Sequence, residues 1–371
     1  MQFSYSKSSL KKVGEKLRHA EPLDQEEEIA FAMYRLGHKN IIEAFRQKHR
    51  LLLIKPQWKH RSVIFASRLK KRSTISMKLK SRQTQMDLTR MNDIAGCRLI
   101  FPVLPALYEY RSIFLKEADK FGRYELRTRN GQYDYIAHPR DTGYRGVHDV
   151  YVEANSDPIK AKIEVQYRTA VQHSWATALE IWDFGHGHGA KFGSETEVVQ
   201  RLFSFIAELF WRYLDSNPSD KRLNVSSRVL YKEILNLNQE VRLIEFFAER
   251  KSLVSSKYPY YSRSKSDILL RRFRPNIRLP GPVEEEINVI TDPWDDLTEE
   301  LFDDEKNEYR DSVLVSMDSK LVRSAYNNYF DDASEFKKNM RKALLMAYDD
   351  IEGIKRCFVK DPELYIQMLS T

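Results

Sequence analysis

The sequence has almost no cysteine and no long apolar stretch. Among its 371 residues only Cys97 and Cys357 are cysteines, which excludes a disulfide scaffold and a cysteine-rich zinc site and suits a reducing compartment. No run approaches the roughly 18 consecutive apolar residues of a membrane span. Residues 1–16 are polar and basic, so we expect no secretory signal. These absences predict a cytoplasmic protein.

The charged residues are abundant and unevenly distributed. The formal net charge is +8, yet residues 61–130 hold 16 basic and 6 acidic residues, and residues 221–282 hold 14 and 5. Residues 283–371 reverse the balance, with 11 basic and 22 acidic residues. A basic block is either a solvated surface or a contact for polyphosphate or nucleic acid.

Hydrophobic periodicity predicts a mixed β-sheet flanked by helices, an α+β fold. Strands are expected at 95–101, 124–129, 147–152 and 159–167, where β-branched and aromatic residues concentrate. Helices are expected from Leu23, where Asp24 and Glu27 resemble a capping box, and at 62–80, with a break near Arg72–Ser73. Further helices are expected at 107–121, 169–182 and 195–214.

The chain divides into two predicted domains, 1–220 and 221–371, joined by a linker at 216–220. The second begins with a long helix, from Val225 to about Ser255. Strand candidates follow at 268–270, 287–290 and 312–316, before a mostly helical tail at 334–369. This gives the C-terminal region an α/β character.

Two segments could hold a polyphosphate and its metal ion. Residues 61–82 contain eight Lys or Arg and no acid, among them Arg68, Lys70 and Lys78. On a continuous helix, Arg68 and Lys78 could lie on a broadly shared side. Asp93 and Arg98 flank a short Ala-Gly turn at the entrance of an apolar strand, where a carboxylate could bind Mg²⁺. Each segment taken alone fits an ordinary charged surface better.

Two further segments could hold a nucleoside. Gly143 and Gly146 bracket Tyr144 and Arg145, a pair suited to stacking on a base, although a core tyrosine in a turn is the plainer interpretation. Strand alternation places Glu164, Gln166 and Arg168 on one face, which marks a site or a solvent face. Helix residues Gln172, His173 and Trp175 follow.

Read in order, these residues resemble the synthetase domain of the RelA/SpoT family. The motifs are R-x-K…K at 68–78, D-I-A-G-x-R at 93–98, D-Y-I-x-x-P-R-x-x-G-Y-R-x-x-H at 134–148 and E-x-Q-x-R-T-x-x-Q-H-x-W-A at 164–176. The resemblance covers about residues 57–185 and implies a nucleotidyltransferase-like fold.

The resemblance implies an ATP pyrophosphotransferase, which moves the β,γ-pyrophosphate of ATP onto a ribose 3′-hydroxyl with Mg²⁺. It places Arg68, Lys70, Lys78 and Arg98 at ATP, and Asp93 and Glu164 as catalytic and metal-binding residues. It places Tyr144, Arg145, His148, Gln166 and Arg168 at the acceptor.

One departure from the family bears on the acceptor. Tyr133 stands where many alarmone-producing members have a lysine before D-Y-I, which weakens the case for an acceptor with its own 5′-diphosphate. A polynucleotide 3′ end has no such group. The expected acceptor is therefore the 3′-CCA end of tRNA, and the alternative is a guanosine or adenosine nucleotide, as in (p)ppGpp or (p)ppApp synthesis.

The C-terminal extension contains Tyr326 and Tyr329 in a Tyr-x-x-Tyr motif, which is often core packing. In this position it resembles the fused toxin–antitoxin members of the family, the CapRel type. That resemblance implies a toxic synthetase that inhibits translation, autoinhibited by its C-terminal region and released by a phage protein such as a capsid protein. It would then serve antiviral defence.

Three other interpretations remain. A catalytically silent RNA-binding module would not need Asp93 and Glu164. His148 and Asp149 form the H-D pair of a metal phosphohydrolase, but they lie in a predicted strand. His186 and His188 could bind a metal, although two histidines in a glycine-rich loop are more often structural.

Overall fold

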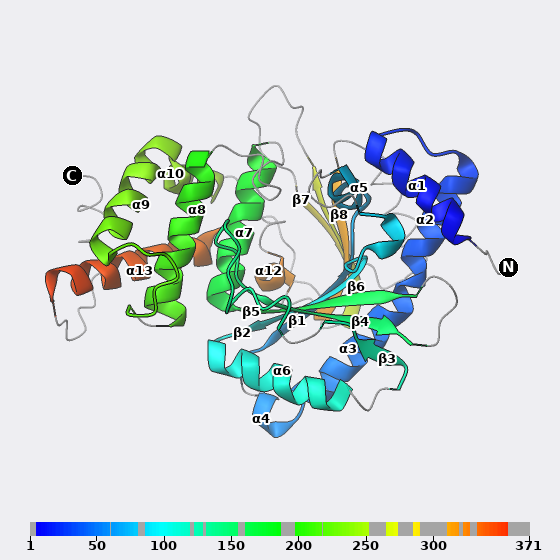
Figure 1. The fold of residues 1–371 in the computed structure, drawn as a ribbon, viewed down its shortest axis with the longest axis horizontal. Helices are drawn as coiled ribbons and strands as arrows, with labels where there is room; N and C mark the ends of the chain where they lie inside the picture. Colours follow the sequence, from blue (N-terminus) through cyan, green and yellow to red (C-terminus); the bar gives the residue numbers. More distant parts are fainter. Residues whose placement is uncertain are drawn as a thin grey trace.

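A computed structural model describes residues 5–59, 61–80, 86–118, 122–128, 131–154, 160–186, 197–216, 218–251, 265–273, 285–289, 310–318, 322–326 and 332–354. An eight-stranded mixed sheet forms its centre, in the order β3-β4-β5-β2-β1-β8-β6-β7. The fold is α+β, with helices flanking the sheet (Figure 1), as the sequence predicts. No helix in the described ranges is both long and apolar enough to cross a membrane.

The first five strands come from the N-terminal half. They are β1 (Ile64–Leu69), β2 (Ala95–Phe101), β3 (Tyr124–Leu126), β4 (Val147–Glu153) and β5 (Lys162–Thr169). Strand β2 runs parallel to β5 and antiparallel to β1, and β4 is antiparallel to both β5 and β3. The four strands predicted from composition in this half are confirmed, with shifted ends.

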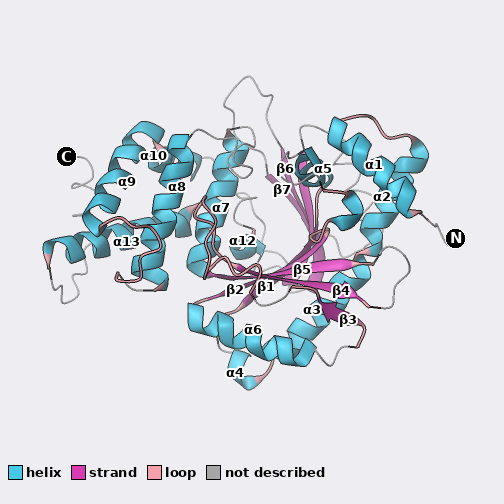
Figure 2. Ribbon diagram, in the orientation of Figure 1, coloured by secondary structure: helices cyan, strands magenta, loops and turns pink. Residues whose placement is uncertain are grey.

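Helices cover one face of these strands and form the first hydrophobic core. Figure 2 shows α3 (Lys39–Leu53) and α6 (Leu104–Ala118) packed below the sheet, and both contact β2 and β5. The same core includes residues of α1 (Lys7–His19), α2 (Gln25–Gly37), α4 (Pro56–Lys59), α5 (Arg72–Lys80) and a 3₁₀ turn at Leu88–Arg90. The predicted capping box of Asp24 and Glu27 is present at the start of α2.

The second core is helical and joins the two halves of the chain. It is built by α7 (Ala170–Gly185), α8 (Glu197–Phe210), the π-helical turn Trp211–Asp215, α9 (Ser227–Val241), α10 (Leu243–Lys251) and α13 (Ser334–Glu352). These helices stand beside the sheet (Figure 1). The division at residue 220 stays a prediction, and residues from both sides of it share this core.

The C-terminal region also continues the sheet. The three strands predicted there are β6 (Lys265–Phe273), β7 (Glu285–Val289) and β8 (Arg310–Asp318). Strand β8 pairs with β1, Ser67 opposite Ser316 and Arg68 opposite Val315. The short helix α12 (Val322–Ala325) then returns to β1 on the face opposite α3 and α6.

Two helix predictions are wrong. The predicted helix at 62–80 is strand β1 followed by helix α5, because pairing with β2 and β8 overrides the helical periodicity of this basic segment. The long helix after Val225 is two helices, which end and restart at Arg242. Arg242 is left-handed, with φ of 56°, and its amide donates to the Asn238 carbonyl and closes α9.

Candidate active site

Sheet register places the predicted site residues in two rows on the face that α12 approaches. Arg68, Gly96 and Glu164 are paired neighbours across β1, β2 and β5. Two residues further along, Arg98 pairs with Gln166, which pairs with His148 of β4. Because side chains alternate between faces, both rows point to the same side.

Two of the residues predicted to bind ATP contact the Asp93 carboxylate. Lys70, directly after β1, donates to one Asp93 oxygen at 2.8 Å, and Lys78 of α5 donates to the other at 2.9 Å. Burial alone would raise the pKa of Asp93, but the two ammonium groups outweigh it and hold that pKa well below its usual range. Lys70 and Lys78 thus converge from a strand end and a helix.

Four of the residues predicted to bind the acceptor form a closed ring of hydrogen bonds with Glu164, which we call the acceptor ring. Gln166 Nε2 donates to Glu164 Oε2 at 2.6 Å, and Arg168 Nη2 donates both to Gln166 Oε1 at 3.1 Å and to the Tyr144 hydroxyl at 3.0 Å. His148 closes the ring, with Nε2 2.6 Å from the Tyr144 hydroxyl and Nδ1 3.1 Å from Glu164 Oε1. Five side chains from β4, β5 and a loop thereby fix one another.

Charge is concentrated in this ring. Burial opposes a charge on His148, but Tyr144 and Glu164 raise its pKa to about 9. Burial would likewise raise the pKa of Glu164, but His148 lowers it to about 2. Arg168 and His148 together bring the pKa of Tyr144 down to about 8 against the effect of burial. Glu164 is therefore ionised at neutral pH.

An aromatic cluster extends the acceptor side outward. Tyr135 lies edge-on to both Tyr144 and His148, with ring centroids 5.8 and 5.4 Å apart, and Tyr133 is 6.2 Å from Tyr135. Arg140 lies over the Tyr135 ring at 4.3 Å and donates to its hydroxyl at 2.7 Å. Aromatic rings with an arginine can stack on bases of single-stranded nucleic acid.

The C-terminal segment reaches the ATP side. The Tyr326 ring is buried, the Arg98 guanidinium lies 6.0 Å from its centroid, and its hydroxyl donates to the Ser67 carbonyl at 3.3 Å. Burial raises the pKa of Tyr326 to about 12, although Arg68 and Arg98 oppose the shift. Tyr329 lies outside the described residues.

Main-chain carbonyls of α12 bind two residues of the synthetase motifs. Arg98 Nη1 donates to the Ala325 carbonyl at 3.4 Å, and His173 Nε2 lies 3.2 Å from the Ser324 carbonyl. Burial, with Arg98 and Arg168 nearby, holds the pKa of His173 well below its ordinary value, so the ring is neutral and can donate through Nε2. The sequence motifs do not predict this contact of His173.

Arg145 is the predicted site residue that the structure places elsewhere. Its Nη2 donates to Glu208 of α8 at 3.1 Å, and its guanidinium lies over Trp211 at 5.4 Å. Glu208 also accepts from Arg212 at 2.7 Å, so the three form a buried ion cluster. Arg145 therefore joins the Tyr144 loop to the helical core, and it does not lie with the acceptor ring.

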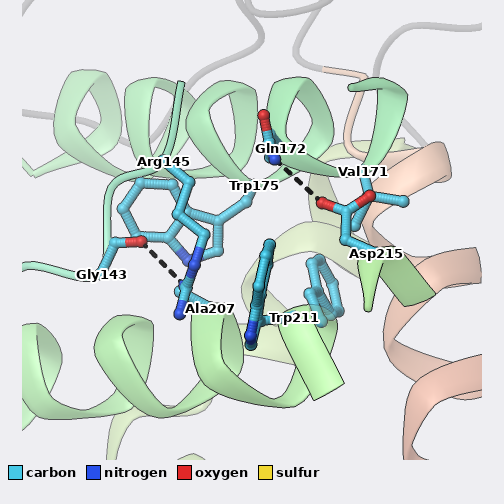
Figure 3. A pocket seen from close by; sticks show the side chains of 9 residues that line it. Gly143, Arg145, Val171, Gln172, Trp175, Ala207, Trp211 and Asp215 are labelled. Carbon is cyan, nitrogen blue, oxygen red and sulfur yellow. Dashed lines mark hydrogen bonds between the residues drawn. The ribbon is translucent and has the colours of Figure 1, made fainter. Parts of the chain in front are cut away.

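A small pocket behind this loop has a structural role (Figure 3). It lies between α7, α8 and the π-helical turn, and Gln172 donates to Asp215 across it at 3.1 Å. Its free volume of about 10 Å³ is at the lower limit for a single water molecule, which excludes a substrate.

Asp93 and Glu164 fit a site for Mg²⁺ completed by substrate phosphates. The charge of Asp93 acts on Glu164 and opposes the lowering of its pKa, as expected for two neighbouring carboxylates. No group of three His, Cys, Asp or Glu side chains capable of holding a metal ion occurs within the described ranges. One or two carboxylates together with phosphate oxygens is the usual arrangement for Mg²⁺ with a nucleotide. His188, of the predicted histidine pair, lies outside the described residues.

Comparison with known proteins gives a family match for the site region. Residues 67–187 match the family described as "Region found in RelA / SpoT proteins". The match contains every predicted site residue apart from Tyr326 and Tyr329. It supports the predicted enzyme class, a pyrophosphotransferase of RelA/SpoT type. A search of curated proteins found no match.

Solved structures resemble part of the chain. Small alarmone synthetase 1 from Bacillus subtilis, bound to its product pppGpp, is 20% identical over 47% of this chain and 88% of its own, with a TM-score of 0.37. Small alarmone synthetase 2 from the same organism is 22% identical over 49% and 91%, with a TM-score of 0.37. A GTP pyrophosphokinase family protein from Streptococcus pneumoniae is 18% identical over 63% and 100%, with a TM-score of 0.38.

Proposed function

We propose that this protein transfers the β,γ-pyrophosphate of ATP to the 3′-hydroxyl of a tRNA 3′ end and is held inactive by its own C-terminal segment. The observation that carries the autoinhibition is the position of Tyr326. Its ring centroid lies 6.0 Å from the guanidinium of Arg98, the residue that would stack on adenine. Tyr326 and ATP would compete for the same surface.

The placement of the side chains supports the following transfer step. The acceptor oxygen attacks the β-phosphorus of ATP, the bond from that phosphorus to the α–β bridging oxygen breaks, and AMP leaves. Lys70, Lys78 and Arg68 bind the phosphates, and Glu164 assists the metal or takes the hydroxyl proton. Mg²⁺, when bound, neutralises charge on the transferred phosphates.

The preference for an RNA end rests on the aromatic cluster. Tyr133, Tyr135 and Arg140 extend from Tyr144 and are partly exposed, so they can contact bases beyond the terminal nucleoside. A mononucleotide acceptor would leave them without a ligand. An alarmone synthetase making (p)ppGpp or (p)ppApp is the second candidate, and the family match favours it equally.

The test is an acceptor screen with ATP labelled at the γ-phosphate. We expect Tyr326→Ala to label tRNA at least about tenfold faster than wild type, because the adenine face of Arg98 becomes accessible. Tyr326→Phe is the matched control, since it keeps the ring beside Arg98 and removes the hydroxyl that donates to Ser67. Tyr326→Ala combined with Asp93→Asn should be inactive.

The same screen separates the alternatives. Label on GDP, GTP or an adenine nucleotide, with none on tRNA, would establish the alarmone synthetase. RNA binding without transfer to any acceptor would establish the silent module. In cells, Tyr326→Ala should inhibit translation, and co-expressed phage capsid proteins can then be screened for release of the wild-type protein.

A further inference from the structure

Both oxygens of Asp93 are already bound by cations in this structure. The Lys70 and Lys78 ammonium groups lie 2.8 and 2.9 Å from them, and the Lys70 and Asp93 side chains are only 11% and 16% exposed. The Lys70 amide donates to the Ile94 carbonyl at 2.8 Å, so the backbone fixes Lys70 beside Asp93. The candidate metal ligand is therefore part of a small, buried cluster with two lysines.

A divalent ion reaching this cluster alone would be repelled. The three side chains together carry a formal charge of +1, and a metal ion bound to Asp93 would lie close to both ammonium groups, where repulsion is strong. Among the charges that act on Lys70, Asp93 is the anion, whereas Lys78 and Arg68 are cations. An ammonium group displaced from Asp93 would thus need a new anion, since burial penalises an uncompensated charge.

A nucleotide triphosphate supplies the anionic groups that the displaced lysines need. Its phosphate oxygens can accept from both ammonium groups and can complete the coordination of the metal ion. We propose that Lys70 and Lys78 close Asp93 to free divalent ions, and that the metal ion enters only together with a triphosphate. This rests on the proposed ATP site and makes both lysines positioning residues for the metal ligand.

The test uses Mn²⁺ alone as the probe, with free Mn²⁺ measured by electron paramagnetic resonance on the full-length protein. Lys78→Met should bind one Mn²⁺ at least about tenfold more tightly than wild type, because one competing cation is gone. Lys80→Met is the matched control: it removes an exposed lysine two residues further along α5 and should stay within twofold of wild type.

A second variant locates the effect. Adding Asp93→Asn to Lys78→Met should abolish the gain. The proposal is overturned if Lys78→Met binds Mn²⁺ no better than Lys80→Met, or if the gain persists without Asp93. Thermal melts check folding, and Lys78→Gln replaces Lys78→Met if the latter does not fold. Because neither RNA nor catalysis is involved, failure of the acceptor screen leaves this test intact, and the reverse also holds.

Discussion

Single residues of the same motif have different tasks. In the Gly-Tyr-Arg segment, Tyr144 joins the acceptor ring, whereas Arg145 binds Glu208 in the helical core. In the last motif, Glu164 faces the site, while Gln172 caps a helix and donates to Asp215. A motif therefore contains both residues of the candidate site and residues that hold the surrounding elements in place. The spacing of the motif alone does not distinguish these two kinds of residue.

Gly96 gives a prediction at the residue scale. It lies between Arg68 and Glu164 in one row of the sheet, and a Cβ there would have only two backbone oxygens near it, both at 3.9 Å. Gly96→Ala should fold normally and gain up to about 1 kcal/mol in the free energy of unfolding. Its methyl group would nevertheless narrow the space between Arg68, which is proposed to bind the phosphates, and Glu164.

Initial rates should fall about tenfold or more in Gly96→Ala, since small displacements of reacting groups are costly. Rates are measured by AMP release in the Tyr326→Ala background, and stability by urea unfolding. Normal activity would show that the substrate does not pass over Gly96.

At the scale of elements, strand β1 is the segment for which the local sequence pattern predicted the wrong secondary structure. Its residues Ser67 and Arg68 interrupt the apolar alternation, and it lies within a run of basic residues. Pairing with β2 on one side and β8 on the other makes it a strand. Consequently Arg68 and Lys78 do not share a helix, and the fold brings their elements together.

Helix α7 gives a prediction at this scale. Thr169 caps it by accepting from the Gln172 amide, and the Thr169 hydroxyl also donates to buried Asp215 at 3.0 Å. Thr169→Val removes both bonds at nearly constant volume. We expect a loss of about 2 kcal/mol in the free energy of unfolding, against about 1 kcal/mol for Ser226→Ala, a plain helix cap of α9.

The loss should depend on pH. Burial raises the pKa of Asp215 to about 6, above its unfolded value. The free energy of unfolding therefore falls as pH rises through 6, because ionised Asp215 is less favourable in the folded protein than in the unfolded chain. The hydrogen bond from the Thr169 hydroxyl stabilises the ionised Asp215 carboxylate most. The loss in the free energy of unfolding caused by Thr169→Val should therefore be larger at pH 7.5 than at pH 5. Urea unfolding at both pH values measures it; equal costs would remove Asp215 from the explanation.

At the scale of the whole molecule, the C-terminal region is built into the enzyme. Phe336 of α13 packs against the rings of Phe203, Phe210 and Phe247, and β8 covers the edge of β1. The proposed inhibition would therefore not require a separate domain that docks and leaves. A local movement of α12 and Tyr326 would expose Arg98 while both cores stay intact.

Truncation is the corresponding prediction. A chain ending at residue 220 lacks α9, α10, α13 and β8, and it exposes the apolar faces of α7 and α8. We expect it to aggregate, whereas full-length Tyr326→Ala stays monodisperse in size-exclusion chromatography. Phe336→Ala should cost about 3–5 kcal/mol in the free energy of unfolding. A soluble, cooperatively folding 1–220 fragment would contradict this interpretation.

The sequence by itself determined the motifs, which predict ATP-side and acceptor-side residues, and its periodicity locates β2, β4 and β5. Only the tertiary structure decided which of them meet. Sheet register aligns His148, Gln166 and Arg98 across three strands, and a contact between residues 98 and 326 leaves no local pattern in either segment. Local periodicity reports which face of an element is buried, whereas the partner of that face is fixed by long-range packing.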